Sequence, residues 1–501
     1  MSAIAKLIKG GAWLTLANVV SKLASALALP LLARLLGPES LGIYSVVFSL
    51  AQSAQSFSTL GADVAMQRNG AQHNTLGTDA VGRLFGVGLS LICLVSAVTG
   101  LGIWFFREPL AKHWLGQPDV IPWLGATAIL IVLQPWGNIP LLFLASLQDF
   151  RAYALRSSLG MIVSSAATVV LAWKFGLAGA VQGLLLAAIA QIVWSYLIVK
   201  PVLRSKGIRL RVDRFWQESH SILKFGFPYY FGNTLLSTLV SLPLMGLVSQ
   251  YGGLEQLGYL RVAQSMAALI GFIPSAIAPA AISYLSASSL EDKESYQDLK
   301  SVHLRGVWIL LLVPTGAVCL VLPDLIHWLF GDVYQQATVL SWLSLWISTI
   351  AGIASVLVQC LLAMGKTVRV AWISSLGAIC GVLVTLILVP KYQALGFLLG
   401  QLSGQLVGLL FCVHSVVSDL KTNDLNSLKW LLFISLLIME CSISVSLLNL
   451  SAIVRWLLVL ILIIILFIFI FKYVLKSGEK LSLLNLANQL KKKLNLKIHG
   501  N

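Results

Sequence analysis

Long apolar stretches alternate with short polar connections along the whole chain. Each stretch holds about 20 residues or more, the length that an α-helix needs to cross the ~30 Å hydrocarbon core of a bilayer. The pattern predicts an all-α polytopic membrane protein with about 14 transmembrane helices. The expected helices cover 12–36, 41–62, 84–106, 121–146, 153–173, 177–199, 222–248, 257–286, 304–322, 338–363, 370–390, 394–417, 429–448 and 452–475.

Lysine and arginine fall unevenly between the two sides of this predicted topology. With the N-terminus in the cytoplasm, the segments on that side hold 27 of the 35 basic residues, and those on the opposite side hold 7. Cytoplasmic loops of membrane proteins carry such an excess. We therefore expect both termini in the cytoplasm.

Composition agrees with the membrane assignment and excludes other classes. The chain is 58% hydrophobic and 11% charged, with a mean hydropathy of +0.87, so it lacks the polar surface of a soluble domain. Its net charge of +16 reflects membrane orientation, so no nucleic-acid partner is expected.

The two halves of the chain resemble each other at a nearly constant offset. SSLG at 157–160 recurs at 374–377, and Gly42 matches Gly258 in similar surroundings. Six expected helices per repeat make the repeats parallel, and transporters commonly place a cavity between such halves. The predicted domains are a six-helix bundle at 1–199, a basic cytoplasmic linker at 200–220, a second bundle at 221–417, two additional helices at 418–475 and a basic tail at 476–501.

The tail suggests a further partner. Its leucines recur at helical spacing beside three consecutive lysines, a pattern typical of a helix on an anionic membrane surface. A solvated basic tail is the alternative interpretation.

Two basic residues within expected helices are candidates for a binding site. Lys22 falls near the middle of the first and Arg261 near the outer end of the eighth. The repeat places Ser237 opposite Lys22 and Ser45 opposite Arg261, so the scaffold itself requires neither charge. A cation at mid-membrane costs at least ~2.5 kcal/mol, which an anionic ligand in a cavity would offset. We expect Lys22 and Arg261 to bind phosphate groups of a substrate, with pairing to an internal acid or an interfacial position as the alternatives.

Polar and proline positions extend this candidate site. Asn18 and Asn233 match in the two repeats and are expected to contact substrate, or else to join helices by hydrogen bonds. Pro30 and Pro243 are expected to kink helices that line the cavity, or to be ordinary packing kinks. No catalytic residue, metal or cofactor is expected.

Two other arginines have a simpler expected role. Arg34 and Arg156 lie close to predicted helix ends, and we expect them to anchor the protein at the membrane interface.

Three stretches carry a family resemblance. ARLLGPESLGIYS (33–45), STLGADVAMQR (58–68) and KFGFPYYFGN (224–233) resemble the oligosaccharide flippases of the multidrug/oligosaccharidyl-lipid/polysaccharide (MOP) superfamily. The resemblance implies a MATE-like fold of two six-helix bundles around a central cavity plus two helices.

The same resemblance implies a substrate and partners. The implied substrate is a polyprenyl-diphosphate-linked oligosaccharide for lipopolysaccharide O-antigen or exopolysaccharide synthesis, moved from the cytoplasmic to the periplasmic leaflet of a bacterial inner membrane. A polysaccharide polymerase and chain-length machinery would be further partners. Related lipid II flippases carry basic residues in helices 1, 2 and 8, whereas this chain has none inside helix 2.

Two other functions are alternatives to the flippase. A cation-coupled drug exporter of the same fold usually needs an acid in its cavity, and the first helix carries Lys22 and no acid. A membrane polysaccharide polymerase or acyltransferase would need catalytic motifs, and the chain has no HExxH, GxSxG or carboxylate cluster.

Overall fold

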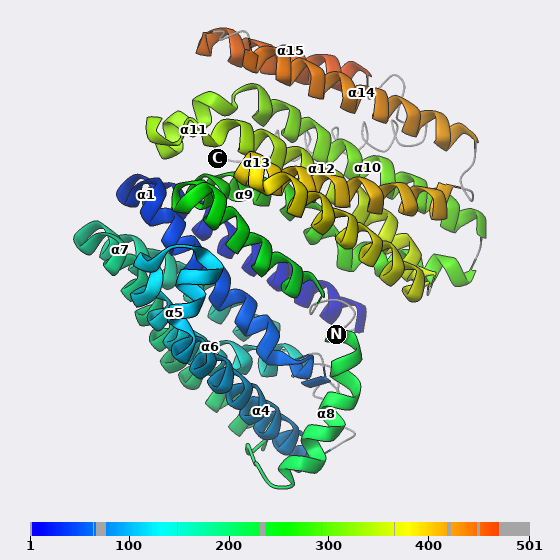
Figure 1. The fold of residues 1–501 in the computed structure, drawn as a ribbon. Coiled ribbons are helices and arrows are strands. Elements are labelled where there is room, and N and C mark those ends of the chain that lie inside the picture. The colour runs from blue at the N-terminus through cyan, green and yellow to red at the C-terminus, as the bar shows by residue number, and fades with distance from the viewer. Residues whose placement is uncertain are drawn as a thin grey trace, which may run out of the picture. The chain divides into compact units, whose positions relative to one another are not determined.

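The structure is a computed structural model that describes residues 3–63, 65–66, 77–147, 149–230, 236–291, 293–364, 366–417, 422–447 and 451–469. All regular elements in these ranges are helical. The long helices are α1 (Ala3–Thr59), α4 (Thr78–Phe105), α6 (Ile121–Ser146), α7 (Phe150–Ser205), α8 (Phe215–Tyr230), α9 (Leu236–Glu291), α10 (Lys293–Leu320), α12 (Ala337–Ala363), α13 (Thr367–Val417), α14 (Thr422–Leu447) and α15 (Ala452–Phe469) (Figure 1). The short ones are α5 (Arg107–Pro109), η1 (Leu110–Leu115), η2 (Pro118–Val120), α11 (Leu322–Phe330) and η4 (Asp332–Tyr334).

The helices are long and apolar enough to make this a multi-pass membrane protein. In the described ranges, eight helical segments meet the length and hydropathy needed to cross a bilayer. Two of them run for 55 and 49 residues, which is enough for two crossings each. The described parts of the expected spans fall on helices, while 231–235, 448 and 470–475 lie outside the described residues. The count of fourteen crossings stays a prediction.

Four long helices are each interrupted by one residue with positive φ. The breaks lie at Gly37 in α1 (φ 74°), Gly176 in α7 (φ 59°), Gly253 in α9 (φ 74°) and Gln393 in α13 (φ 51°). Glycine adopts positive φ without strain because it lacks a Cβ. The first and third breaks are 216 residues apart, and the second and fourth are 217 apart. The backbone thus breaks at equivalent points of the two sequence repeats.

Glycine contacts beside two of these breaks repeat in the same way. In α7, a Cβ added to Gly179 would lie 1.9 Å from the carbonyl oxygen of Leu171. In α13, a Cβ on Gly396 would lie 2.5 Å from the carbonyl oxygen of Leu388, again 217 residues on. The two helical hairpins therefore close by the same backbone packing, and the predicted parallel repeat is confirmed in the fold.

Contacts between residues divide the chain into two compact units. The first unit comprises Met1–Leu269, Ile326–Ile347 and Ala371–Gly408, and the second Ile270–Leu325, Ser348–Val370 and Leu409–Asn501. These units do not follow the two repeats, since the first unit contains the first repeat and part of the second. The predicted domain boundaries therefore stay a prediction.

In the first unit, α4, α6 and α7 pack side by side (Figure 1). Phe85 of α4 and Phe143 of α6 stack with ring centroids 4.2 Å apart in the buried core between them.

The predicted linker is docked against α4. The segment after α7 is extended, and the Arg211 amide donates to the Gly82 carbonyl over 3.1 Å. Added Cβ atoms at Gly82 and Gly86 would each lie 2.1 Å from a carbonyl oxygen of this segment. The ion pair between Arg83 and Glu218 (3.5 Å) adds a side-chain link. Two glycines one turn apart thus form a groove that fixes the linker.

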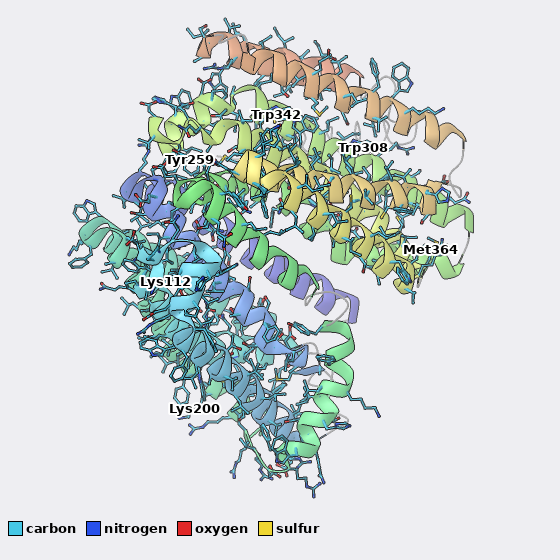
Figure 2. All side chains as sticks on the ribbon, viewed as in Figure 1. Lys112, Lys200, Tyr259, Trp308, Trp342 and Met364 are labelled. Carbon is cyan, nitrogen blue, oxygen red and sulfur yellow. The ribbon has the colours of Figure 1, made fainter. Side chains whose placement is uncertain are left out.

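The second unit joins α14 and α15 to α10. Arg455 of α15 makes a two-pronged ion pair with Asp324 of α11, and both side chains are largely buried. Trp308, labelled in Figure 2, donates its indole N–H to the Ser435 hydroxyl over 3.1 Å. Polar side chains therefore connect the additional helices to this unit. The tail at 476–501 lies outside the described residues.

Candidate functional site

Two helices of the first unit cross at glycines near the breaks. A Cβ added to Gly42 of α1 would lie 1.9 Å from the Leu254 carbonyl oxygen, and one on Gly258 of α9 would lie 2.0 Å from the Pro38 carbonyl oxygen. Each residue of one contact is 216 positions from its counterpart in the other. The crossing therefore has an internal two-fold relation, and only glycine permits so close an approach.

Arg261 lies one helical turn beyond this crossing. It is partly buried, and its guanidinium carbon is 4.5 Å from the centroid of the Phe48 ring of α1. Phe48 in turn stacks on Tyr44, whose side chain is buried, with centroids 6.2 Å apart. A basic side chain of the second repeat thus lies on aromatic rings of the first.

The charge of Arg261 is only partly compensated. Among the described residues, no carboxylate forms an ion pair with Arg261, and its Nε has no hydrogen-bond partner. A desolvated cation–π contact contributes about 2 kcal/mol. The Phe48 ring therefore stabilises the guanidinium in this position, and the Nε–H group can donate to an anion.

A second feature of the crossing is a pair of reciprocal hydrogen-bonded clamps. Arg34, three residues before the break of α1, donates from Nε to the Leu329 carbonyl over 3.0 Å and from Nη2 to the Trp328 carbonyl. Gln250, three residues before the break of α9, donates from Nε2 to the carbonyls of His113 (2.6 Å) and Trp114 (3.0 Å).

Each clamp holds a turn that contains the sequence His-Trp-Leu. These turns, 113–115 and 327–329, lie near the C-terminal ends of η1 and α11. The last carbonyls of a helix lack intrahelical partners, and side-chain donors satisfy them here. Each repeat thus caps a turn of the other with a side chain at the same repeat position.

The comparisons with known proteins agree with this architecture. Residues 31–339 match the family described as "Polysaccharide biosynthesis protein", which is more than half of the chain. The chain belongs to this family. A similar curated protein is the succinoglycan biosynthesis transport protein ExoT of Rhizobium meliloti (strain 1021), 27% identical over 250 residues. The match covers 48% of this chain and 45% of that protein, so it spans about half the length of its relative.

Solved structures place this member of the polysaccharide biosynthesis protein family in a known fold. The lipid II flippase MurJ in an inward closed conformation has a TM-score of 0.72 at 16% identity, over 91% of this chain and 98% of that one. An inward-facing multidrug resistance MATE family transporter of the MOP superfamily has a TM-score of 0.63 at 16% identity, over 80% and 95%. The predicted MATE-like fold is confirmed.

Of the four residues predicted to bind substrate, only Arg261 has a side chain that the structure describes. Arg261 lies at the crossing, whereas Lys22 and Asn18 lie in α1 with side chains outside the described residues. Asn233 also lies outside the described residues. The proposed roles of these four residues stay predictions.

The two prolines lie in helices that stay continuous around them. Pro30 is buried in α1 and Pro243 falls within α9, while the breaks lie at Gly37 and Gly253. At the offset of 216 that the breaks share, Pro30 corresponds to Gly246, three residues beyond Pro243. A kinking role for the prolines stays a prediction.

The expectation of an interface anchor at Arg156 is wrong. Its side chain is 2% exposed, donates from Nε to the Ser195 hydroxyl over 2.7 Å, and donates from Nη2 to the Gly137 carbonyl over 2.9 Å. The hydroxyl of Ser195 also donates to Gly137. Arg156 is therefore a buried link between α6 and α7, because hydrogen bonds across helices satisfy its donors.

Sequence reasoning also missed the two clamps. The recurring His-Trp-Leu was the available signal, and the offset of 216 between Arg34 and Gln250 was another. Neither signal says which side chain reaches which turn, since the partners are 294 and 136 residues apart in the chain.

Proposed function

We propose that the protein flips a polyprenyl-diphosphate-linked oligosaccharide from the cytoplasmic to the periplasmic leaflet of a bacterial inner membrane. The observation that carries this proposal is Arg261, a cation beside the two-fold crossing of α1 and α9 whose Nε has no hydrogen-bond partner in the part of the chain that the structure describes. A pyrophosphate is the kind of group that a guanidinium binds best. Family membership and the likeness to a polysaccharide transport protein and a lipid II flippase support this substrate class.

The mechanism we propose is alternating access between the two repeats. The headgroup enters from the cytoplasm, Arg261 and Lys22 attract its phosphates, and the lipid tail stays in the bilayer. With an inside-negative potential, outward transfer of each negative charge is favoured by ~2.3 kcal/mol per 100 mV. Both termini would lie in the cytoplasm, and a polymerase and chain-length machinery would use the exported units for O-antigen or exopolysaccharide. Transport of this kind needs no catalytic residue in the protein.

The drug exporter receives less support than the flippase. MATE transporters share the fold, but the group at the crossing is a cation, which repels cationic drugs. Fold alone does not define function.

The test replaces Arg261 in cells that depend on this chain for surface polysaccharide. Arg261→Ala should abolish surface glycan and Arg261→Lys should retain part of it, because lysine keeps the charge without the planar fork. Arg107→Ala is a matched control, since Arg107 lies 4.5 Å from the Trp104 ring in the same kind of cation–π contact away from the crossing. Wild-type glycan from well-expressed Arg261→Ala would contradict the proposal.

A further inference from the structure

A cavity of about 610 Å³ lies beside the Arg34 clamp in the first unit. Arg34 and Gly37 of α1 line one side, and His327, Trp328 and Tyr334 line the other. This volume falls within the ~300–1,000 Å³ typical of small-molecule sites. By the predicted topology, the cavity faces away from the cytoplasm.

The cavity arises from a difference between the two repeats. In the first repeat, Trp114 lies against Gly246, where an added Cβ would be 2.1 Å from the indole nitrogen. The position equivalent to Gly246 in the other repeat is Pro30, which is buried in α1. Trp328 has no matching glycine to pack on and stays 55% exposed, whereas Trp114 is half-buried. One proline in place of a glycine thus leaves an indole at the cavity wall.

Two glycines keep the cavity open. Gly37 (φ 74°) and Gly331 (φ 94°) both line it, and an added Cβ at either would meet no atom within 4 Å. Positive φ at these positions also disfavours any larger residue. A side chain at either position would take up space beside the cavity.

The polar groups of the cavity are held in fixed positions. Arg34 uses two of its five N–H donors on carbonyls, so three donors of an oriented guanidinium have no partner among the described residues. The His327 ring pairs through Nδ1 with Asp332 at 2.5 Å. Tyr334 donates to the Ala33 carbonyl over 2.9 Å, and burial raises the pKa of this hydroxyl, so it stays protonated at neutral pH. The Tyr259 ring, labelled in Figure 2, meets the Tyr334 ring edge to face, with ring centroids 6.1 Å apart.

We propose that this cavity binds a pyranose sugar. The face of an indole is electron-rich and attracts the C–H groups on one side of a sugar ring. Guanidinium N–H groups supply directional donors for its hydroxyl oxygens, and the Nε2 atom of the neutral His327 ring can accept from a hydroxyl, because Nδ1 donates to Asp332. This inference rests on the proposed function, because the sugar would belong to the exported headgroup and be held here before release.

The alternative is that Trp328 is an ordinary aromatic anchor at the membrane interface. Trp114 occurs in the same His-Trp-Leu sequence, so a comparison of variants at Trp114 and Trp328 distinguishes the two explanations. An anchoring role affects both tryptophans alike, whereas a sugar site affects Trp328 alone.

The test is saturation-transfer NMR on the purified full chain in lauryldimethylamine oxide, a detergent without sugar. The probes are methyl β-glucopyranoside and glucuronate, with free inorganic phosphate added as a competitor in a separate arm. We expect transfer to the ring protons of both sugars, and stronger transfer to glucuronate if its carboxylate reaches Arg34. Phosphate that displaces both sugars completely would mean a simple anion site and overturn the proposal.

Matched variants complete the test. Trp328→Leu and Arg34→Gln should lower sugar affinity about tenfold, since an aromatic contact or a charged hydrogen bond contributes about 1.4 kcal/mol. Trp114→Leu should leave it unchanged. Equal losses in both leucine variants, or no transfer to the unsubstituted chain, would overturn the proposal.

Surface glycan in cells separates this inference from the proposed function. If Arg261→Ala abolishes glycan while no sugar binds the purified chain, only the sugar site fails. If sugar binding depends on Trp328 while glycan is normal in Arg261→Ala, the sugar site stands and the role of Arg261 in flipping fails.

Discussion

The two His-Trp-Leu turns show how a repeated backbone can acquire different chemistry in its two copies. Both turns are capped by a side chain three residues before a helix break of the other repeat. In one copy the donor is the neutral Gln250 and the tryptophan packs on Gly246; in the other the donor is the cationic Arg34 and the tryptophan stays exposed. The backbone constraint is shared, so the difference between the halves lies in a few side chains.

The shared part of this comparison is tested by the crossing glycines. Gly42→Leu and Gly258→Leu should both abolish folded protein. Each new side chain would clash with a backbone carbonyl oxygen of the opposing helix, and a helix backbone cannot shift locally to relieve the clash. Fluorescence-detected size-exclusion chromatography measures the loss. Gly102→Leu is the control, since a Cβ there meets nothing within 4 Å. If one leucine variant yields much more folded protein than the other, the two glycine contacts of the crossing do not contribute equally to stability.

The second prediction moves the positive charge of Arg261 from the second repeat to the first. Arg261→Ser should lower glycan export at least about tenfold, because a charged hydrogen bond to phosphate contributes about 1.5–3 kcal/mol. Adding Ser45→Arg, at the equivalent position of the first repeat, should restore part of the export. The test compares the amount of surface glycan made by the single and the double variant at equal protein levels. A double variant as inactive as Arg261→Ser would show that the partner ring at Phe48, and not the position near the crossing, is what matters.

The third prediction compares the two clamps. Arg34→Ala should lower the free energy of unfolding by about 1–2 kcal/mol and Gln250→Ala by about 0.5–1 kcal/mol, because hydrogen bonds from charged donors are the stronger ones. The melting temperatures of the purified variants rank these losses of stability. Arg34→Gln should fall between the two, since it makes this clamp resemble the other. A larger loss for Gln250→Ala would contradict the assignment of Arg34 as the stronger cap.

The smallest expected effect concerns Trp114. Gly246→Ala should push the indole outward, because the new methyl group would lie 2.1 Å from its nitrogen. Hydroxyl-radical footprinting should then show labelling of Trp114 rising about twofold toward that of Trp328, as overpacking displaces the more mobile partner. Unchanged labelling would mean that Trp114 owes its half-buried state to other contacts.

Much of the fold follows from sequence because the membrane leaves few options. Apolar stretches of this length must be helices, and the offset of 215–217 residues between matching motifs already indicates two parallel repeats. Arg261 was also identifiable, since a basic residue opposite Ser45 cannot be part of the repeated scaffold.

Arg156 and Arg34 show where sequence reasoning is insufficient. Both look like interface anchors, yet Arg156 is buried between α6 and α7, and Arg34 caps a turn 294 residues away. A side chain near a predicted helix end can point outward or inward, and hydropathy does not distinguish the two. The distinction depends on whether a partner such as Ser195 lies within hydrogen-bonding distance.

The sequence by itself determined the membrane assignment, the helical class and the repeat, because composition, periodicity and offset are properties of the chain alone. Only the tertiary structure decided which segments meet: the crossing at Gly42 and Gly258, the exchange of caps between repeats, and the cavity beside Trp328. The physical reason is that these features depend on backbone atoms approaching within van der Waals distance across more than 100 residues of chain. Such approaches are permitted by small residues but are specified only by the packing of the whole unit.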